Sequence, residues 1–152
     1  MTGAPFQLCF DGSDSAAHAI REAAAITGGG RALVVHAWLP PSAVMLQGRA
    51  LEPSHPLAAA VDEFDSAARE AAERVAARGV ELAGEAGFDA EPLAIQAPDG
   101  VWKPLVQIAE EREVRAVIVG SHGLSRVKSA LLGSVSREVA NHCKRPVIVV
   151  PP

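Results

Sequence analysis

The chain has 152 residues, 49% of them hydrophobic, and carries a formal net charge of −4. That length suits one domain over residues 1–152, and the weakly acidic balance argues against nucleic-acid binding and against attachment to anionic membranes. No apolar run reaches the length of a membrane span, and residues 1–10 show no signal-peptide pattern. Cys9 and Cys143 belong to no C-x-x-C pair, which favours reduced thiols. Together these features predict a cytoplasmic protein.

Strand-like and helix-like hydrophobic patterns alternate along the chain. The predicted elements are a strand at 6–10, a helix at 14–27, a strand at 32–39, a helix at 57–86, a strand at 89–97, a helix at 101–109, a strand at 115–119, a helix at 134–142 and a strand at 146–150. The periodicity places Ile26 and Phe64 on the buried faces of the first two helices. Residues 41–56 are rich in proline and predict a surface loop.

This alternation predicts a three-layer α/β/α sandwich around a five-stranded parallel sheet. We expect the strand order 3-2-1-4-5, which is a Rossmann-like arrangement. In open sheets of this kind, ligands bind beyond the carboxyl ends of the strands, at the point where the strand order reverses. The loops after the first and fourth strands are therefore the candidate site.

The loop after the fourth predicted strand has an unusual spacing of glycines. Gly120-Ser121-His122-Gly123 is followed by nine residues and then by Gly133-Ser134. Gly120 and Gly123 allow sharp turns and a close approach of the backbone to a ligand. Gly133 and Ser134 stand where the last helix begins, and the free N–H groups of a helix start form an anion site.

Further groups in this loop suit a phosphate. Ser134 and Ser136 offer hydroxyl donors, and Arg126 and Lys128 add two cations. The alternative is a plain loop in which Ser134 caps the helix, because serine is a common N-cap and glycine is common in loops.

Asp11-Gly12-Ser13-Asp14 follows the first predicted strand. A carboxylate at Asp11 could accept hydrogen bonds from a ribose hydroxyl or help to hold a divalent cation. The alternative is a turn in which Ser13 or Asp14 caps the first helix. We favour the cap for Asp14 and a functional role for Asp11.

Histidine and tryptophan add weaker signals. His122 stands in the glycine loop, whereas His36 lies within the second predicted strand, where a structural role is more common. We expect Trp38 and Trp102 to be packing residues and His142 to be a surface residue without a pattern. The sequence contains no Walker A motif, no G-x-G-x-x-G fingerprint, no nucleophile elbow and no metal-ligand cluster.

Taken together, these strings resemble the universal stress protein family over essentially the whole chain. The most specific match is the glycine, two residues, glycine, nine residues, glycine and serine spacing that begins at Gly120. Phe-Asp-Gly-Ser at the first strand, Val-Val-His-Ala at the second and Lys-Arg-Pro-Val-Ile-Val-Val near the end are also similar to the family.

The resemblance implies a fold similar to that of the adenine nucleotide alpha hydrolases, and ATP binding with Mg²⁺ nearby. By position, Asp11 would contact the ribose or adenine side and could share the Mg²⁺, and the backbone around Ala37 would meet the adenine edge. The candidate nucleotide-binding residues are Asp11, Gly12, Ser13, His36, Ala37, Gly120, Ser121, His122, Gly123, Arg126, Gly133, Ser134, Val135 and Ser136. Family members that resemble this chain pair their last strands, so the resemblance implies a homodimer through Val147 to Val150, an edge that is apolar and open to pairing.

Three functions remain open at this point. The first is an ATP-binding regulatory or stress-adaptation protein with little or no ATPase activity, because the phosphate cradle lacks an evident base or nucleophile. The second is a slow Mg²⁺-dependent ATP hydrolase or nucleotidyl transferase that would use Asp11 and His122. The third is a partner-binding module without nucleotide.

Overall fold

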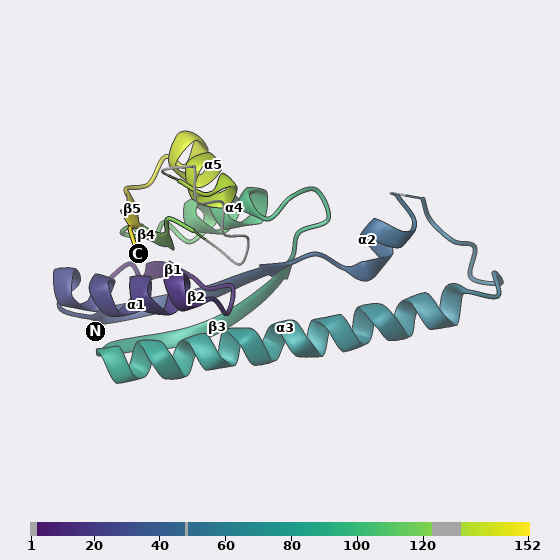
Figure 1. Cartoon of the computed structure of the whole chain (residues 1–152), viewed down its shortest axis with the longest axis horizontal. Coiled ribbons are helices and arrows are strands. Elements are labelled where there is room, and N and C mark those ends of the chain that lie inside the picture. Colours follow the sequence, from purple (N-terminus) through teal and green to yellow (C-terminus); the bar gives the residue numbers. More distant parts are fainter. Residues whose placement is uncertain (1–2, 48, 123–131) are drawn as a thin grey trace.

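The computed structural model of the chain describes residues 3–47, 49–122 and 132–152. Its elements, in chain order, are β1 (Phe6–Cys9), α1 (Asp14–Thr27), β2 (Gly30–Trp38), α2 (Pro41–Met45), α3 (Ala58–Ala86), β3 (Phe88–Gln96), α4 (Trp102–Glu111), β4 (Val117–Gly120), α5 (Ser134–His142) and β5 (Val147–Val150). Figure 1 shows these elements along the longest axis of the molecule. Within the described residues, no helix is both long and apolar enough to cross a membrane.

The five strands form one parallel sheet of order β3-β2-β1-β4-β5, which confirms the predicted order. The longest pairing joins β2 to β3 from Gly30 opposite Phe88 to Trp38 opposite Gln96. All five strands are parallel, and the order in which they are added to the sheet reverses between β1 and β4. A crevice is therefore expected beyond the carboxyl ends of these two strands.

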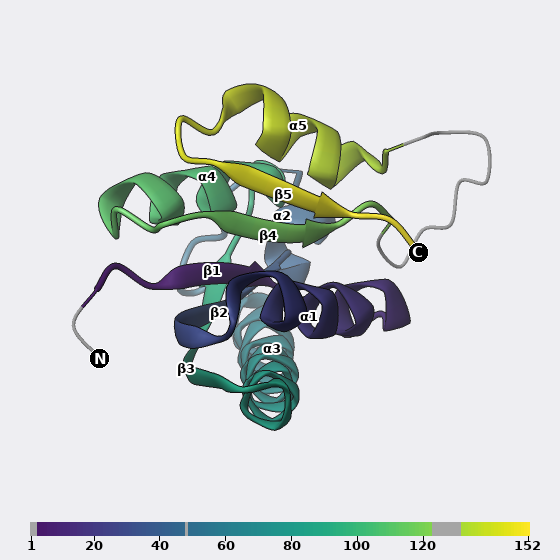
Figure 2. The ribbon, with the colours of Figure 1, turned by 90° about the vertical axis from the view of Figure 1, so that its left-hand side faces the viewer.

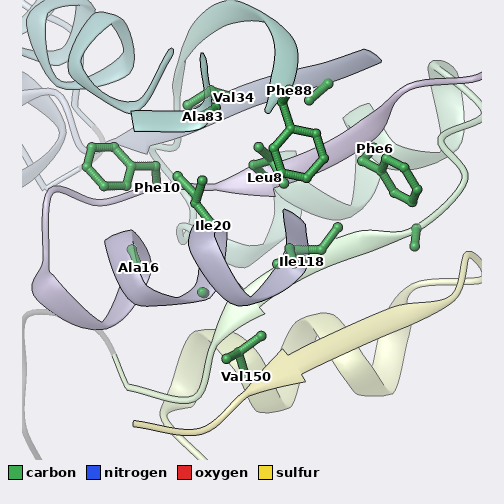
Figure 3. Close-up of a cluster of buried hydrophobic side chains, with 14 residues drawn as sticks. Phe6, Leu8, Phe10, Ala16, Ile20, Val34, Ala83, Phe88, Ile118 and Val150 are labelled. Carbon is green, nitrogen blue, oxygen red and sulfur yellow. The ribbon is translucent and has the colours of Figure 1, made fainter. Parts of the chain in front are cut away.

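Side-chain alternation along β1 divides the core between the two faces of the sheet. Phe6 and Leu8 lie in a cluster with residues of α1 and α3, and Cys9 lies in the other cluster, with residues of α4 and α5. Figure 2 shows α5 above the strands and α1 and α3 below them. Figure 3 shows Leu8, Phe10 and Ile20 gathered in the first cluster. Both sheet faces are therefore covered, as a parallel sheet requires.

Three local expectations were wrong. The predicted loop at 41–56 contains a short helix, α2, which begins with Pro41 at a position where proline favours a helix start. Ile26 is 65% exposed, because it lies roughly 120° around α1 from the buried Ile20. Phe64 is 55% exposed, because the first half of α3 extends beyond the sheet (Figure 1).

The second half of α3 packs very closely on the sheet. A Cβ atom on Gly79 would lie 2.6 Å from Val34 Cγ1 and 2.7 Å from Phe10 Cδ1, both of them core atoms. Gly84, one and a half turns further along the same helix, has nothing within 4 Å of such a Cβ. Glycine at position 79 therefore sets the distance between α3 and the strands.

We expect Gly79→Ala to destabilise the protein by about 1–2 kcal/mol. The free-energy cost of overpacking the core with the added methyl exceeds the gain from the higher helix propensity of alanine. Gly84→Ala is the matched control, and it should stabilise by about 0.5–1 kcal/mol. Urea unfolding of both variants gives the free energies. Equal stability of the two variants would contradict the close contact at Gly79.

Candidate functional site

A cavity of about 690 Å³ lies beyond the carboxyl ends of β1, β2 and β4, beside the start of α5. Ten of the residues predicted from the sequence line it: Asp11, His36, Ala37, Gly120, Ser121, His122, Gly133, Ser134, Val135 and Ser136. Gly12 and Ser13 are not among the lining residues. Gly123, Arg126 and Lys128 lie outside the described residues.

The turn after β1 is built by side chain-to-backbone hydrogen bonds. The Ser13 N–H donates to Asp11 Oδ1 at 2.9 Å, and the Ala16 N–H donates to Ser13 Oγ at 3.1 Å. Ser13 is therefore the cap of α1, and Asp14 is its first helical residue. Gly12, with φ of 85°, provides the left-handed step between them. Only one oxygen of Asp11 serves this turn, so the other is available to the cavity.

At the end of β4, Gly120 allows two elements to approach each other. A Cβ at this position would lie 2.8 Å from Ser15 Oγ and 3.1 Å from the Ser15 carbonyl oxygen. The sequence pattern indicates a glycine that makes room for a ligand, but here the missing side chain first makes room for α1. The packing brings the turn at Asp11 next to the end of β4.

The first turn of α5 has backbone donors without a partner among the described residues. Gly133 is the N-cap, and no side chain caps the helix. The first helical bond runs from the Arg137 N–H to the Gly133 carbonyl at 3.0 Å, so the N–H groups of Ser134, Val135 and Ser136 have no acceptor within the helix. The alternative that Ser134 is the cap is therefore wrong. Residues 134–136 line the cavity, and free N–H groups at the positive end of a helix dipole are groups to which anions bind in proteins.

Ser136 has a different role from the one expected. Its side chain is buried, and Oγ lies 3.1 Å from the Ser121 carbonyl oxygen and 3.0 Å from the Gly133 carbonyl oxygen. The hydroxyl proton is therefore used within the protein rather than offered to a phosphate. A Cβ on Gly133 would lie 2.9 Å from the same Ser121 oxygen, so this close junction requires glycine.

His36 joins the ends of β1 and β2. Its Nδ1 lies 2.9 Å from the Phe10 carbonyl oxygen, so Nδ1 carries the proton and donates. Burial lowers the pKa of His36, and the bond to Phe10 and the charge of Asp11 oppose this shift only in part. His36 is therefore neutral near neutral pH. In the glycine loop, His122 Nδ1 lies 2.9 Å from Ser121 Oγ.

Sequence reasoning missed the apolar wall of the cavity and one cation. Cys9, Trp38, Val101 and Leu105 line the wall. Burial raises the pKa of the Cys9 thiol to about 12, so it behaves as a small apolar group. Arg137 also lines the cavity, and its Nε lies 3.7 Å from Glu138 Oε1. The signal for Arg137 was its position one turn after Gly133-Ser134.

Trp102 is a packing residue, as expected, and it packs against a histidine. Trp102 stacks on His142, with ring centroids 4.5 Å apart and an interplanar angle of 18°. His142 Nε2 also lies 3.2 Å from Glu138 Oε2. The His142 side chain is half-exposed, and through Trp102 it connects α5 to the start of α4. The sequence predicts a surface residue without a pattern and does not indicate this contact.

The cavity fits a magnesium ion only together with phosphates. Among the described residues, no group of three or more His, Cys, Asp or Glu side chains could hold a metal ion. In the same part of the chain, Asp11 is the single acidic side chain that lines the cavity. One carboxylate combined with nucleotide phosphates is a common environment for Mg²⁺, which would neutralise phosphate charge there.

Comparison with known proteins decides the family. The model of the universal stress protein family matches residues 7–151. The chain belongs to the universal stress protein family. A universal stress protein from Thermus aquaticus is 32% identical over 145 residues, which cover 94% of this chain and 95% of that protein. The universal stress protein Rv1636 of Mycobacterium tuberculosis is 31% identical over 146 residues, which cover 92% and 90% of the two chains.

Two further relatives of this universal stress protein match over shorter stretches, and solved structures agree with it in fold. The matches to the universal stress proteins MJ0577 of Methanocaldococcus jannaschii and YxiE of Bacillus subtilis span 28% and 60% of those proteins. The structure of MJ0577 superposes with a TM-score of 0.76 at 22% identity, covering 97% of this chain and 95% of that one. An Archaeoglobus fulgidus universal stress protein in complex with dAMP superposes with a TM-score of 0.62 at 21% identity, covering 98% of each chain.

The position of His36 predicts a pH dependence of stability. Its pKa in the folded protein lies below the usual 6.5, so its contribution is complete above pH 6.5 and is lost as the pH falls towards the folded value. His36→Asn keeps a donor for the Phe10 carbonyl but cannot titrate. We expect the wild type to lose free energy of unfolding relative to His36→Asn below pH 6.5, with a slope of up to about 1.4 kcal/mol per pH unit.

Urea unfolding between pH 7.5 and 5 measures this difference, and the exposed His55→Asn is the control. Parallel curves for the wild type and His36→Asn would show that His36 takes up a proton equally in both states.

Proposed function

We propose that this universal stress protein binds ATP and acts as a nucleotide-dependent regulatory or stress-adaptation protein, with little or no ATPase activity. The observation that carries the proposal is the uncapped start of α5, which lines the same cavity as Asp11 and His36. The dAMP complex of the Archaeoglobus fulgidus protein, which shares the fold, supports an adenine nucleotide as the ligand.

The lining residues suggest which of them would bind each part of the nucleotide. The available Asp11 oxygen would accept a hydrogen bond from a ribose hydroxyl. The backbone around Ala37 would meet the adenine edge, beside the apolar wall that includes Leu105. The N–H groups of residues 134–136 would bind the phosphates, with Mg²⁺ shared between the phosphates and Asp11.

The side chains near this cavity favour binding over hydrolysis. One oxygen of Asp11 is used by the Ser13 N–H, and the Nδ1 proton of His36 is used by the Phe10 carbonyl. Efficient hydrolysis requires a base or a positioning group held for the attacking water. His36 is committed to the Phe10 carbonyl, and His122 Nδ1 lies 2.9 Å from Ser121 Oγ. The second oxygen of Asp11 is assigned here to the ribose and the Mg²⁺, and this distribution supports a protein that keeps its nucleotide intact.

The role of α5 is tested by a negative charge at its start. Ser134→Glu should fold normally, because Ser134 is exposed and an acidic residue stabilises the first turn of a helix. The same carboxylate competes with phosphate for the N–H groups. We expect the Kd for Mg·ATP, measured by calorimetry, to rise at least tenfold and the Kd for adenosine to stay unchanged.

Ser134→Ala is the matched control and should bind as the wild type does, since the proposal assigns binding to backbone donors. Equal ATP affinity in Ser134→Glu would refute the phosphate site. Phosphate release during the same incubation separates the two classes of function, and a turnover near 1 s⁻¹ would favour the hydrolase.

We also propose that two copies pair through β5. This strand is at the edge of the described sheet, and Val147, Ile148 and Val149 are only partly buried. The carbonyls of Pro146 and Val150 accept bonds from β4. By the alternation of a parallel ladder, the N–H and C=O groups of Val147 and Val149 point away from β4 and are open to a second copy.

Val149→Pro removes one outward N–H without removing a bond to β4, so the dimer should weaken at least tenfold while the fold remains. Sedimentation equilibrium gives the dissociation constant, and circular dichroism checks the fold. Val149→Thr, which keeps the N–H, is the control. A dimer of undiminished affinity in Val149→Pro would place the interface elsewhere.

A further inference from the structure

Exposed apolar side chains are concentrated on one part of the molecule, residues 39–71, which we call the arm. Among the described residues, six large hydrophobic side chains are exposed, and Ile26 is the one that lies elsewhere. The five on the arm are Leu39, Val44, Met45, Leu57 and Phe64, with exposed fractions from 47% to 60%. Such a concentration marks an interaction surface rather than ordinary scatter.

The helical parts of the arm are α2 and the first half of α3. The buried residues of α3 are Val61 and then, from Ala72 onwards, those that face the sheet. The first half of α3 therefore projects past the strands, as Figure 1 shows, and α2 lies beside it. The Ser42 N–H donates to Asp65 Oδ1 at 2.9 Å, which fixes the start of α2 on α3.

One face of the projecting helix has the spacing of a coiled-coil seam. The exposed residues on this seam follow steps of three and four: Leu57, Ala60, Phe64, Ala67 and Ala71. Alternating steps of three and four are the a and d positions of a heptad. The buried Val61 and Ala72 lie roughly 60–80° around the same helix from Phe64, beside the seam. The apolar surface of this helix is thus wider than its covered part, and within the described structure the seam is the part that stays exposed.

The charge around the seam indicates what could cover it. Glu63 and Glu70 each precede a seam residue and are exposed. Residues 39–71 contain five acidic side chains and two Lys or Arg side chains, a net charge of −3 out of −4 for the chain. A second copy packed antiparallel would place these glutamates against each other, which is unfavourable. A helix with basic flanks would pair with both of them.

We infer that the arm is a docking surface for an amphipathic helix of another protein, with large aliphatic residues along its seam and lysine or arginine beside them. Apolar packing on Leu57 and Phe64 provides the contact area, and the glutamates select the partner by charge. The inference is independent of the nucleotide, although Leu39, the first residue of the arm, also lines the cavity.

Two synthetic 21-residue helices test the inference. Both carry leucine at the seam positions, one with lysine and one with glutamate in the flanks. Fluorescence anisotropy should show binding of the lysine peptide at least tenfold tighter than that of the glutamate peptide. Phe64→Glu should weaken the lysine peptide at least tenfold, whereas Ile26→Glu, an equally exposed substitution on α1, should leave it unchanged. Glu63→Lys with Glu70→Lys should reverse the preference between the peptides.

Two results would overturn the inference. Equal binding of the lysine peptide to wild type and Phe64→Glu would show attraction to negative charge without use of the seam. An equal loss of binding in Ile26→Glu would show that the loss is not specific to the seam. Self-association of Val149→Pro that disappears on adding Phe64→Glu would show that the arm pairs with a second copy instead. Circular dichroism and thermal unfolding confirm that the exposed substitutions keep the fold.

Discussion

The site depends on one buried backbone junction at Ser121. Its N–H donates to the Val150 carbonyl at 2.9 Å, and its carbonyl oxygen accepts from the Gly133 N–H and from Ser136 Oγ. These bonds hold β4, β5 and the start of α5 at one point, although residues 122–132 separate Ser121 from Gly133. Because the junction is buried, each bond exchanges little with water, and loss of one would leave an unpaired polar group. The direction in which the N–H groups of α5 point is therefore fixed before a ligand arrives.

Tight and loose packing are divided between the two halves of the same helix. Around Gly79, α3 touches Val34 and Phe10 so closely that no side chain fits. Around Phe64, the helix leaves a large aromatic ring more than half exposed. Covering the sheet does not explain the first half of α3, because the strands end before they reach it. The same covalent element thus anchors the core and presents a surface beyond it.

Much of the fold could be predicted from the sequence because the strands are short apolar runs and the helices have clear periodicity. The alternation of strands and helices predicted a parallel sheet with helices on both faces. The expected order β3-β2-β1-β4-β5 placed the loops at Asp11 and after Gly120 at one crevice. The family resemblance agreed with the later match over residues 7–151. Helix periodicity failed at Ile26 and Phe64 because it identifies an apolar face without showing whether another element reaches it.

The site was predicted less completely than the fold. Residue type and spacing identified Asp11 and the start of α5, but they could not show that the Ser136 hydroxyl is used by two carbonyl groups. The apolar wall was missed because Val101 and Leu105 have the pattern of any core helix. Tertiary packing decides which apolar residues of a helix line a cavity and which lie in the core. The local sequence contains no signal for this difference.

The thiol at the base of the cavity has a consequence for chemistry under oxidising conditions. Peroxides and related oxidants react with the thiolate form of cysteine, and with a pKa of about 12 only on the order of one Cys9 side chain in 10⁵ is ionised at pH 7. Oxidants would therefore leave this wall of the cavity unchanged. The apolar character of this wall is thus insulated from the redox state of the surroundings.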